Sequence, residues 1–305
     1  MKAIVLAYHN MGLEGLAALR RHGFDIAFVF THEDDPEENC WFGSVKEWAE
    51  KQGIGCATDP VNSPLWIEKI KRLQPDVLFS FYYRNMVRPE VLAIPRVGAF
   101  NLHGSLLPSY RGRCPVNWVL VNGEEETGVT LHYMVEKPDA GDIVGQKAVK
   151  IGFEDTARTL YDKLCDAAGR LLDELLPQMK EGRFPRTKQD LSRGSYYGGR
   201  KPQDGRIAWE QSAISIYNLI RAVTEPYPGA YAFAGNGGKI LIWRATPVVS
   251  ADAGGPGDVM IDGQSVLVKT GDGAVKLLEI EASGARWRDA DIRDYFQQGK
   301  VKKLT

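Results

Sequence analysis

The sequence predicts an α/β protein: a Rossmann-like, mostly parallel sheet domain followed by a small antiparallel β-barrel of OB-like type. In the first half of the chain, short apolar runs alternate with stretches of helical spacing, a pattern typical of βαβ units. Beyond residue 206, short alternating strands lie between Asn-Gly and Asp-Gly turns. We therefore expect a first domain at 1–189, a linker at 190–205 and the barrel at 206–305.

Each element of the first domain follows from its own periodicity. The nearly all-apolar run 2–8 is typical of a strand that is covered on both faces. Leucines 13, 16 and 19 have helical spacing that stops at Gly23, and further leucines predict a long amphipathic helix within 155–180. The other expected strands are 26–30, 76–83, 98–102, 129–135 and 143–151, and the other expected helices are 45–51 and 65–73.

The second domain is expected to begin with a helix over 213–222. Three dipeptides then mark hairpin turns, with strand-like runs at 239–243, 265–269 and 274–280 beside them. These dipeptides are Asn236-Gly237, Asp262-Gly263 and Asp272-Gly273.

Composition narrows the class of protein. The chain has 305 residues, with 38 basic and 39 acidic side chains and a net charge of −1, which does not favour a nucleic-acid partner. No apolar run approaches the roughly 20 residues that cross a bilayer, and the N-terminal run is too short for a secretion signal. The four cysteines form no Cys-x-x-Cys pair, which argues against both a zinc site and disulfides. We expect a cytoplasmic protein that needs no metal and has no membrane partner.

Two segments carry the chemistry. Residues 99–113 contain Asn101 and His103 where a strand gives way to a loop, and Asp139 follows in the segment 138–142. An amide polarises a carbonyl, an imidazole handles protons, and a carboxylate fixes and tunes that imidazole. Together these groups suit the transfer of an acyl group to an amine.

The sequence fits two other classes of protein less well, the nicotinamide-dependent oxidoreductases and the P-loop nucleotide-binding proteins. The turn after the first strand, residues 8–12, lacks the glycines that let a backbone approach a pyrophosphate, which disfavours a nicotinamide oxidoreductase. The chain also lacks a P-loop.

Each candidate residue also has a structural interpretation. His103 alone would be read as a capping histidine, and Asp139 as a turn residue, but their combination with Asn101 favours catalysis. Arg111 and Arg113 are either solvated charges or contacts for an anionic substrate group. By default His9, His22, His32 and His132 are interpreted as structural, His9 with the least assurance because it ends a strand. Cys114 is expected to be incidental.

The segment Phe100–Gly112, with the downstream Asp-Ala-Gly at 139–141, resembles the hallmark of the 10-formyltetrahydrofolate-dependent formyltransferases. The similarity extends through the chain, including the segment 221–230. Within the family, the segments 7–12, 79–84 and 115–124 most resemble the formyltransferase part of bifunctional polymyxin-resistance enzymes that act on UDP-4-amino-4-deoxy-L-arabinose. Those enzymes continue into a decarboxylase domain, whereas this sequence stops at Thr305, so it is either a stand-alone protein or an excised domain.

The resemblance implies a role for each matching residue. Asn101 would stabilise the transition state, His103 would handle protons and Asp139 would tune His103. The co-substrate would be 10-formyltetrahydrofolate, bound by Asn85, Met86, Val87, Arg113, Val135, Glu136, Lys137, Pro138 and Asp139. Apart from the resemblance, Tyr8, His9, Met11 and Arg111 are the candidate contacts for the sugar nucleotide.

Several acceptors stay open. The resemblance implies a UDP-sugar substrate, a place in lipid A modification and association with a decarboxylase of the same pathway. Another nucleotide-linked amino sugar is the nearest alternative. Methionyl-tRNA is less favoured, because the loop 31–39 carries five acidic residues that would repel a nucleic-acid backbone. A non-catalytic folate- or nucleotide-binding protein is the remaining alternative. The oligomeric state is not predicted.

Overall fold

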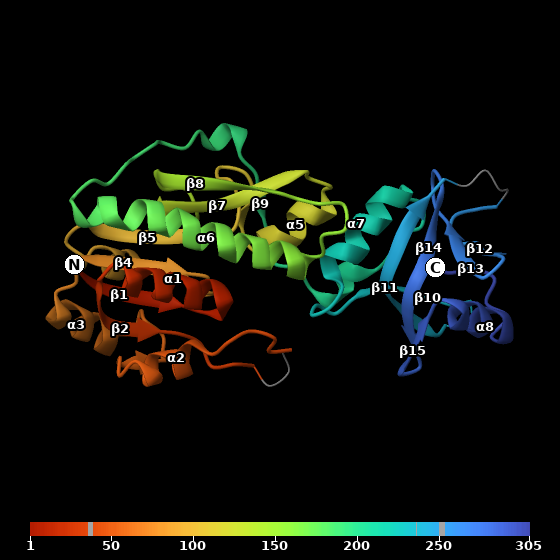
Figure 1. Cartoon of the computed structure of the whole chain (residues 1–305), viewed down its shortest axis with the longest axis horizontal. Coiled ribbons are helices and arrows are strands. Elements are labelled where there is room, and N and C mark those ends of the chain that lie inside the picture. The colour runs from red at the N-terminus through yellow and green to blue at the C-terminus, as the bar shows by residue number, and fades with distance from the viewer. Residues whose placement is uncertain (36–38, 236, 250–253) are drawn as a thin grey trace. The chain divides into compact units, whose positions relative to one another are not determined.

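The computed structural model describes residues 1–35, 39–235, 237–249 and 254–305 (Figure 1). The chain divides into two compact units that interleave in sequence. The first comprises 1–115, 126–151 and 161–198, and the second comprises 116–125, 152–160 and 199–305. The domain division expected from the sequence, at 189 and 206, stays a prediction. Within the described residues, no helix combines the length and the apolar character needed to cross a membrane.

The first unit is built on a seven-stranded sheet in the order β3-β2-β1-β4-β5-β7-β8 (Figure 1). The strands from β3 to β5 are parallel, and β7 and β8 are antiparallel to their neighbours. The expected Rossmann-like, mostly parallel sheet is thus confirmed. The strands are β1 Lys2–Ala7, β2 Asp25–Phe30, β3 Cys56–Ala57, β4 Val77–Phe81, β5 Gly98–His103, β7 Glu126–Tyr133 and β8 Ile143–Lys150.

Helices cover both faces of this sheet. On one face α1 packs on β4 and α6 packs on β8, since Gly15 lies against Phe81 and Gly145 against Leu175. On the other face α3 and α4 contribute Ile70 and Val91 to a core cluster. The helices of this unit are α1 His9–Arg21, α2 Val45–Lys51, α3 Pro64–Leu73, α4 Pro89–Leu92 and α6 Ala157–Lys180, whereas α5 Pro115–Val121 lies almost entirely in the second unit. The fully buried members of the core cluster are Ile4, Leu6, Phe30, Val61, Ile70, Leu78, Val87, Val91 and Ala99.

A small two-stranded sheet ties the loop after β5 to the segment that leaves the first unit. β6 (Arg111–Gly112) pairs in parallel with β9 (Tyr196–Tyr197), and the ring of Tyr110 stacks on that of Tyr197 at 5.0 Å. Gly112 has a φ of +98°, and a Cβ there would lie 2.3 Å from the Tyr197 carbonyl oxygen. Only glycine therefore fits at this position.

The second unit contains an antiparallel sheet in the order β10-β11-β14-β13-β12, with β15 on β14. The sheet closes on itself through the last residues of the chain, because Ala234 bridges to Leu304 and Asp258 to Lys303. The expected barrel is confirmed in this form. Its elements are η2 Pro202–Gly205, α7 Ala213–Val223, β10 Ala230–Phe233, β11 Lys239–Val248, β12 Val259–Asp262, β13 Ser265–Lys269, β14 Ala274–Ala282, β15 Ala285–Arg288 and α8 Ala290–Gln298.

Two of the three expected hairpins are confirmed. Asp262-Gly263 turns β12 into β13, and Asp272-Gly273 turns β13 into β14. The turn at Asn236-Gly237 includes Asn236, which lies outside the described residues, as do Glu37 and Glu38 of the acidic loop. The sequence did not predict α8, β15 or the short pair β6–β9.

The close approach of α1 to β4 generates a stability prediction. A Cβ on Gly15 would lie 2.3 Å from the Phe81 ring, which is fully buried. We expect Gly15→Ala to lower the free energy of unfolding by about 1–3 kcal/mol, because overpacking outweighs the better helix propensity of alanine. Urea unfolding would measure the change.

Gly169 on α6 provides the matched control. A Cβ there would meet only the end of the flexible Glu14 side chain, at 2.5 Å. Gly169→Ala should therefore be neutral or stabilising by up to about 1 kcal/mol. Equal effects of the two substitutions would contradict this account of the α1–β4 contact.

Candidate active site

The two expected catalytic residues of β5 lie on the same face of the sheet. Asn101 pairs with Ser80 of β4 and lies inside the strand, whereas His103 is its last residue. The expectation that Asn101 lies where the strand gives way to a loop is therefore wrong by two residues. Asn101 and His103 lie on the same face of β5 as Ala99, which belongs to the core cluster, because side chains alternate along a strand.

Asp139 completes the cluster from the loop between β7 and β8. Its Oδ1 lies 3.4 Å from Asn101 Nδ2 and 3.6 Å from His103 Nδ1. Its Oδ2 accepts a hydrogen bond of 2.9 Å from the Gly112 N–H. The structure thus brings together the amide, the imidazole and the carboxylate that the sequence predicts to act together.

The loop conformation that carries Asp139 depends on two further residues. Asp139 has a φ of +51°, the left-handed region that non-glycine residues rarely adopt. Gln189 donates to the carbonyl oxygens of Asp139 and Gly141, at 3.0 and 2.6 Å. A Cβ at Gly141 would lie 1.9 Å from the Tyr133 carbonyl oxygen, so the loop can close only with glycine there. No motif or periodicity around Gln189 predicts this role, because the residue lies at the end of the first domain, directly before the expected linker.

The charge of Asp139 is well compensated. Burial acts to raise its pKa, but the charge of His103, the interactions with His132 and the Gly112 N–H lower it, and the pKa lies below its ordinary value. Asp139 is therefore a carboxylate throughout the neutral pH range. A carboxylate in this position can hold a neighbouring imidazole and stabilise positive charge on it.

Sequence reasoning missed His132. It lies on β7 directly opposite Asn101, and its Nε2 is 3.1 Å from Asn101 Nδ2 and 3.4 Å from Asp139 Oδ1. Its Nδ1 donates to the Tyr133 carbonyl oxygen at 2.8 Å, which leaves a lone pair on Nε2. A neutral His132 ring therefore accepts one N–H of the Asn101 amide, whereas a ring that also carries a proton on Nε2 donates it toward Asp139 Oδ1. The default structural interpretation of this histidine overlooked its place in the cluster.

One hydrogen bond of His103 determines which ring nitrogen faces Asp139. Nε2 donates to the Tyr110 carbonyl oxygen at 2.8 Å, so Nδ1 is the nitrogen that faces Asp139. His103 is only 7% exposed. Its ring is thus held by the loop after β5 on one side and faces the carboxylate on the other.

The residues expected to line the folate fall on two segments. Met86 and Val135 are exposed, as are Asn85, Glu136 and Lys137, whereas Val87 is buried in the core cluster. Met134, which precedes Val135, packs against the same cluster. The segments 85–87 and 135–137 are therefore both anchored at this cluster. Asn62 fixes the first segment by donating to the Met86 carbonyl oxygen and accepting from the Arg88 N–H. Arg113 is exposed, and Pro138 is partly buried.

The residues expected to contact the sugar nucleotide are more buried. Tyr8, His9 and Met11 lie at the end of β1 and the start of α1, each at most 6% exposed. His9 has a φ of +66°, and its Nδ1 lies 2.7 Å from the Tyr161 hydroxyl. Its ring lies 3.7 Å from that of Phe42 and 4.4 Å from that of Trp41. Arg111 is 7% exposed. Their role in binding stays a prediction.

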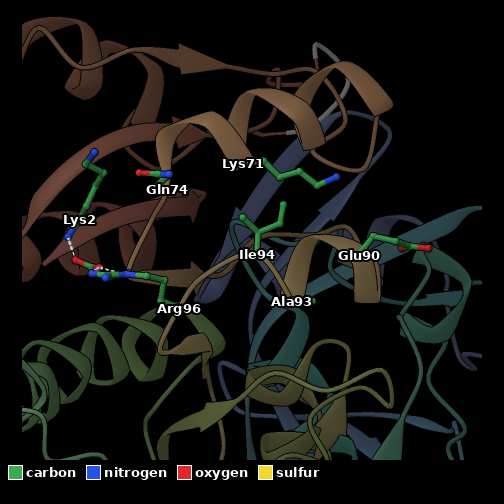
Figure 2. A pocket seen from close by; sticks show the side chains of 8 residues that line it. Lys2, Lys71, Gln74, Glu90, Ala93, Ile94 and Arg96 are labelled. Atoms are coloured by element: carbon green, nitrogen blue, oxygen red, sulfur yellow. Dashed lines mark hydrogen bonds and ion pairs between the residues drawn. The ribbon is translucent and has the colours of Figure 1, made fainter.

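A hollow of about 750 Å³ lies elsewhere on the first unit (Figure 2). It is lined in part by Lys2 and Asp76, which stand at the amino ends of β1 and β4, whereas His103 is at the carboxyl end of β5. Asp76 accepts hydrogen bonds from the Lys2 N–H and from Arg96, so its charge is already compensated. The hollow contributes nothing to the cluster around Asp139. Among the described residues, no group of acidic, histidine or cysteine side chains is arranged to hold a metal ion.

Comparison with known proteins identifies the family. Residues 1–176 match the family described as formyl transferase, and residues 200–298 match the formyl transferase C-terminal domain. The chain belongs to the formyltransferase family and is a formyltransferase.

Solved structures share the fold. WlaRD, a sugar 3N-formyltransferase solved with dTDP and 5-N-formyl-THF, is 20% identical, with a TM-score of 0.70 over 93% of this chain and 98% of that one. An N-formyltransferase from Helicobacter canadensis, in complex with folinic acid and dTDP-3-aminofucose, is 22% identical, with a TM-score of 0.70 over 91% and 98%. HypX from Aquifex aeolicus, in complex with tetrahydrofolic acid, is 18% identical, with a TM-score of 0.62 over 99% and 48%.

His32 generates a prediction about pH. Burial, and the positive charge of Arg84, lower the pKa of His32 to about 4, and its Nε2 accepts the Arg84 N–H at 3.0 Å. Between pH 6.5 and 4 the unfolded chain therefore binds a proton that the folded chain does not, so the free energy of unfolding falls as the pH is lowered. In His32→Gln, which keeps an acceptor but does not titrate, this fall should be smaller. Urea unfolding at pH 7 and pH 4.5 measures it.

The titration can also be observed directly. The Cε1–H resonance of His32 should shift with a midpoint near pH 4 in the folded protein. A midpoint near 6.5, the ordinary value, would show that the ring is not held neutral.

Proposed function

We propose that this enzyme transfers the formyl group from N10 of 10-formyltetrahydrofolate to the 4-amino group of UDP-4-amino-4-deoxy-L-arabinose. The observation that carries the proposal is the cluster of Asn101, His103 and Asp139 in a member of the formyltransferase family. The UDP-sugar rests on the sequence resemblance of residues 7–12, 79–84 and 115–124. A cytoplasmic location and a role in lipid A modification and polymyxin resistance belong to the same proposal.

Related structures support the two substrates. Two sugar formyltransferases of the same fold were solved with a formylated folate and with dTDP or a dTDP-sugar. The same observation favours a second candidate, in which the acceptor is a different nucleotide-linked amino sugar. Methionyl-tRNA is less favoured because of the acidic residues between 33 and 38.

The reaction needs stabilisation of a developing oxyanion. When the uncharged amine attacks the formyl carbon, a C–N bond forms and negative charge moves to the formyl oxygen. The Asn101 amide has one N–H committed to His132, and the other points toward Asp139 at the long distance of 3.4 Å. In the proposed mechanism the formyl oxygen takes the place of that weak contact. Removing one such donor typically costs roughly 10²–10³ in rate.

The reaction also moves a proton. The attacking amine becomes positively charged and must lose a proton, while N10 of the folate must gain one as its bond to the formyl carbon breaks. His103 Nδ1 is the nitrogen that can accept and return this proton, because Nε2 is committed to the Tyr110 carbonyl oxygen. Asp139, 3.6 Å away, stabilises the imidazolium while the proton is held.

Formyl transfer can be tested directly. Incubation with 10-formyltetrahydrofolate and UDP-4-amino-4-deoxy-L-arabinose should add one formyl group to the sugar nucleotide, as measured by mass spectrometry. His103→Ala and Asp139→Ala should abolish turnover, and His103→Ala should leave folding and folate affinity largely unchanged. Near-wild-type turnover in either variant would contradict the assigned roles. No transfer to this sugar, with transfer to a dTDP-linked 3- or 4-amino sugar, would favour the second candidate.

His132 should affect turnover by orienting Asn101. His132→Leu removes the acceptor for one amide N–H, so we expect kcat to fall roughly 10-fold with little change in KM. His132→Gln can still accept a hydrogen bond and should recover part of this loss. Equal kcat values in the two variants would show that the hydrogen bond to Asn101 does not matter.

A further inference from the structure

Arg111 of the first unit is a largely buried cation that has no ion-pair or side-chain hydrogen-bond partner among the described residues. Its side chain is 7% exposed, and its buried Nε has no hydrogen-bond partner. No carboxylate among the described residues forms an ion pair with its guanidinium, and none of its side-chain nitrogens hydrogen-bonds to a described residue. An arginine side chain does not escape this cost by losing its proton, because the guanidinium stays charged in proteins.

Arg221 shows what a structural arginine looks like in the same chain. It is equally buried, at 8% exposure, and its Nε donates to Asn218 Oδ1 at 2.9 Å. Its Nη1 lies within hydrogen-bond distance of three carbonyl oxygens, those of Gly152, Phe153 and Asp155. Arg221 is thus held by hydrogen bonds to four acceptors, whereas the Arg111 guanidinium has none among the described residues.

The backbone at Arg111 is fixed beside the catalytic cluster. The preceding residue, Tyr110, accepts the hydrogen bond of His103 through its carbonyl oxygen, and the following residue, Gly112, donates its N–H to Asp139. The Arg111 N–H donates to the Ser195 carbonyl oxygen at 3.1 Å, and β6 pairs with β9. The position is therefore held on both sides, so the unpaired charge does not result from a loose loop.

Both proposed substrates carry oxyanions that a guanidinium binds well. A nucleotide-linked sugar has a diphosphate, and a folate has the carboxylates of its glutamate. A planar guanidinium donates two parallel hydrogen bonds to either group, and each such charged hydrogen bond is strong when shielded from water.

We propose that the Arg111 guanidinium binds an oxyanion of one of the two substrates, a phosphate or a carboxylate, next to the Asn101–His103–Asp139 cluster. The identity of the substrates rests on the proposed function, but the oxyanion site does not depend on which sugar is formylated. The Arg111 guanidinium, which has no counterion among the described residues, then forms an ion pair with the substrate when the substrate binds.

The test compares Arg111→Met with Arg221→Met. Isothermal titration calorimetry would measure the binding of UDP, inorganic pyrophosphate and 5-formyltetrahydrofolate, with no turnover required. We expect Arg111→Met to bind either the phosphate ligands or the folate roughly 10- to 100-fold more weakly than the wild-type protein. Weaker binding of UDP and pyrophosphate identifies the diphosphate as the partner, and weaker binding of the folate identifies its carboxylate.

Thermal stability separates a binding role from a structural one. Arg111→Met removes a buried charge without a counterion, so its melting temperature should equal or exceed that of the wild-type protein. Arg221→Met breaks a satisfied network and should melt at a lower temperature. If Arg111→Met binds all three ligands as the wild type does, the proposal is wrong, and a lower melting temperature in that case shows that Arg111 is structural.

Arg111→Lys keeps the charge but loses the planar fork, and its affinity should lie between those of the wild type and Arg111→Met. If Arg111→Met does not fold, Arg111→Lys replaces it in the binding measurements. Wild-type affinity of Arg111→Lys for every ligand would then overturn the proposal. Because these measurements need no amino sugar, failure of formyl transfer to every acceptor would leave the result on Arg111 intact.

Discussion

The candidate active site is organised around the carboxylate of Asp139. This one side chain connects three parts of the first unit: β5 through Asn101 and His103, β7 through His132, and the loop after β5 through the Gly112 N–H. A buried carboxylate is stable only when it is well supplied with donors and positive charge. The positions of these elements are therefore constrained by the need to satisfy one anion, and the same arrangement aligns the groups that the proposed mechanism uses.

The sheet supports this arrangement because its strand pairing changes from parallel to antiparallel between β5 and β7. β7 runs antiparallel to β5, which places His132 opposite Asn101. A parallel strand in this place would have a different register and hydrogen-bond pattern. The loop after β7 then folds back, with the left-handed conformation of Asp139 held by Gln189. Strain at a functional position is thus balanced by hydrogen bonds from a distant part of the chain.

Periodicity in the sequence was sufficient for the long elements. The helix α2 was predicted at its observed bounds, and α3, α6 and α7 were predicted to within a few residues, because each has an apolar face with helical spacing. Asn101, His103 and Asp139 were also predicted to lie together. The elements that were missed are short or depend on distant partners: the two residues of β6 have no periodicity, and their pairing with Tyr196 becomes visible only in three dimensions. His132 was missed because its relation to Asn101 depends on the register of two strands.

The pairing of β6 with β9 has a consequence for the order in which the protein is assembled. The loop that carries Tyr110, Arg111 and Gly112 is held by residues 195–197, more than 80 positions later in the chain. Contacts over such a separation form late, because the intervening chain must first be ordered. During synthesis, the loop after β5 can acquire its final hydrogen bonds only after Tyr197 has emerged from the ribosome, so a nascent chain that ends before residue 195 lacks the contacts that hold this loop.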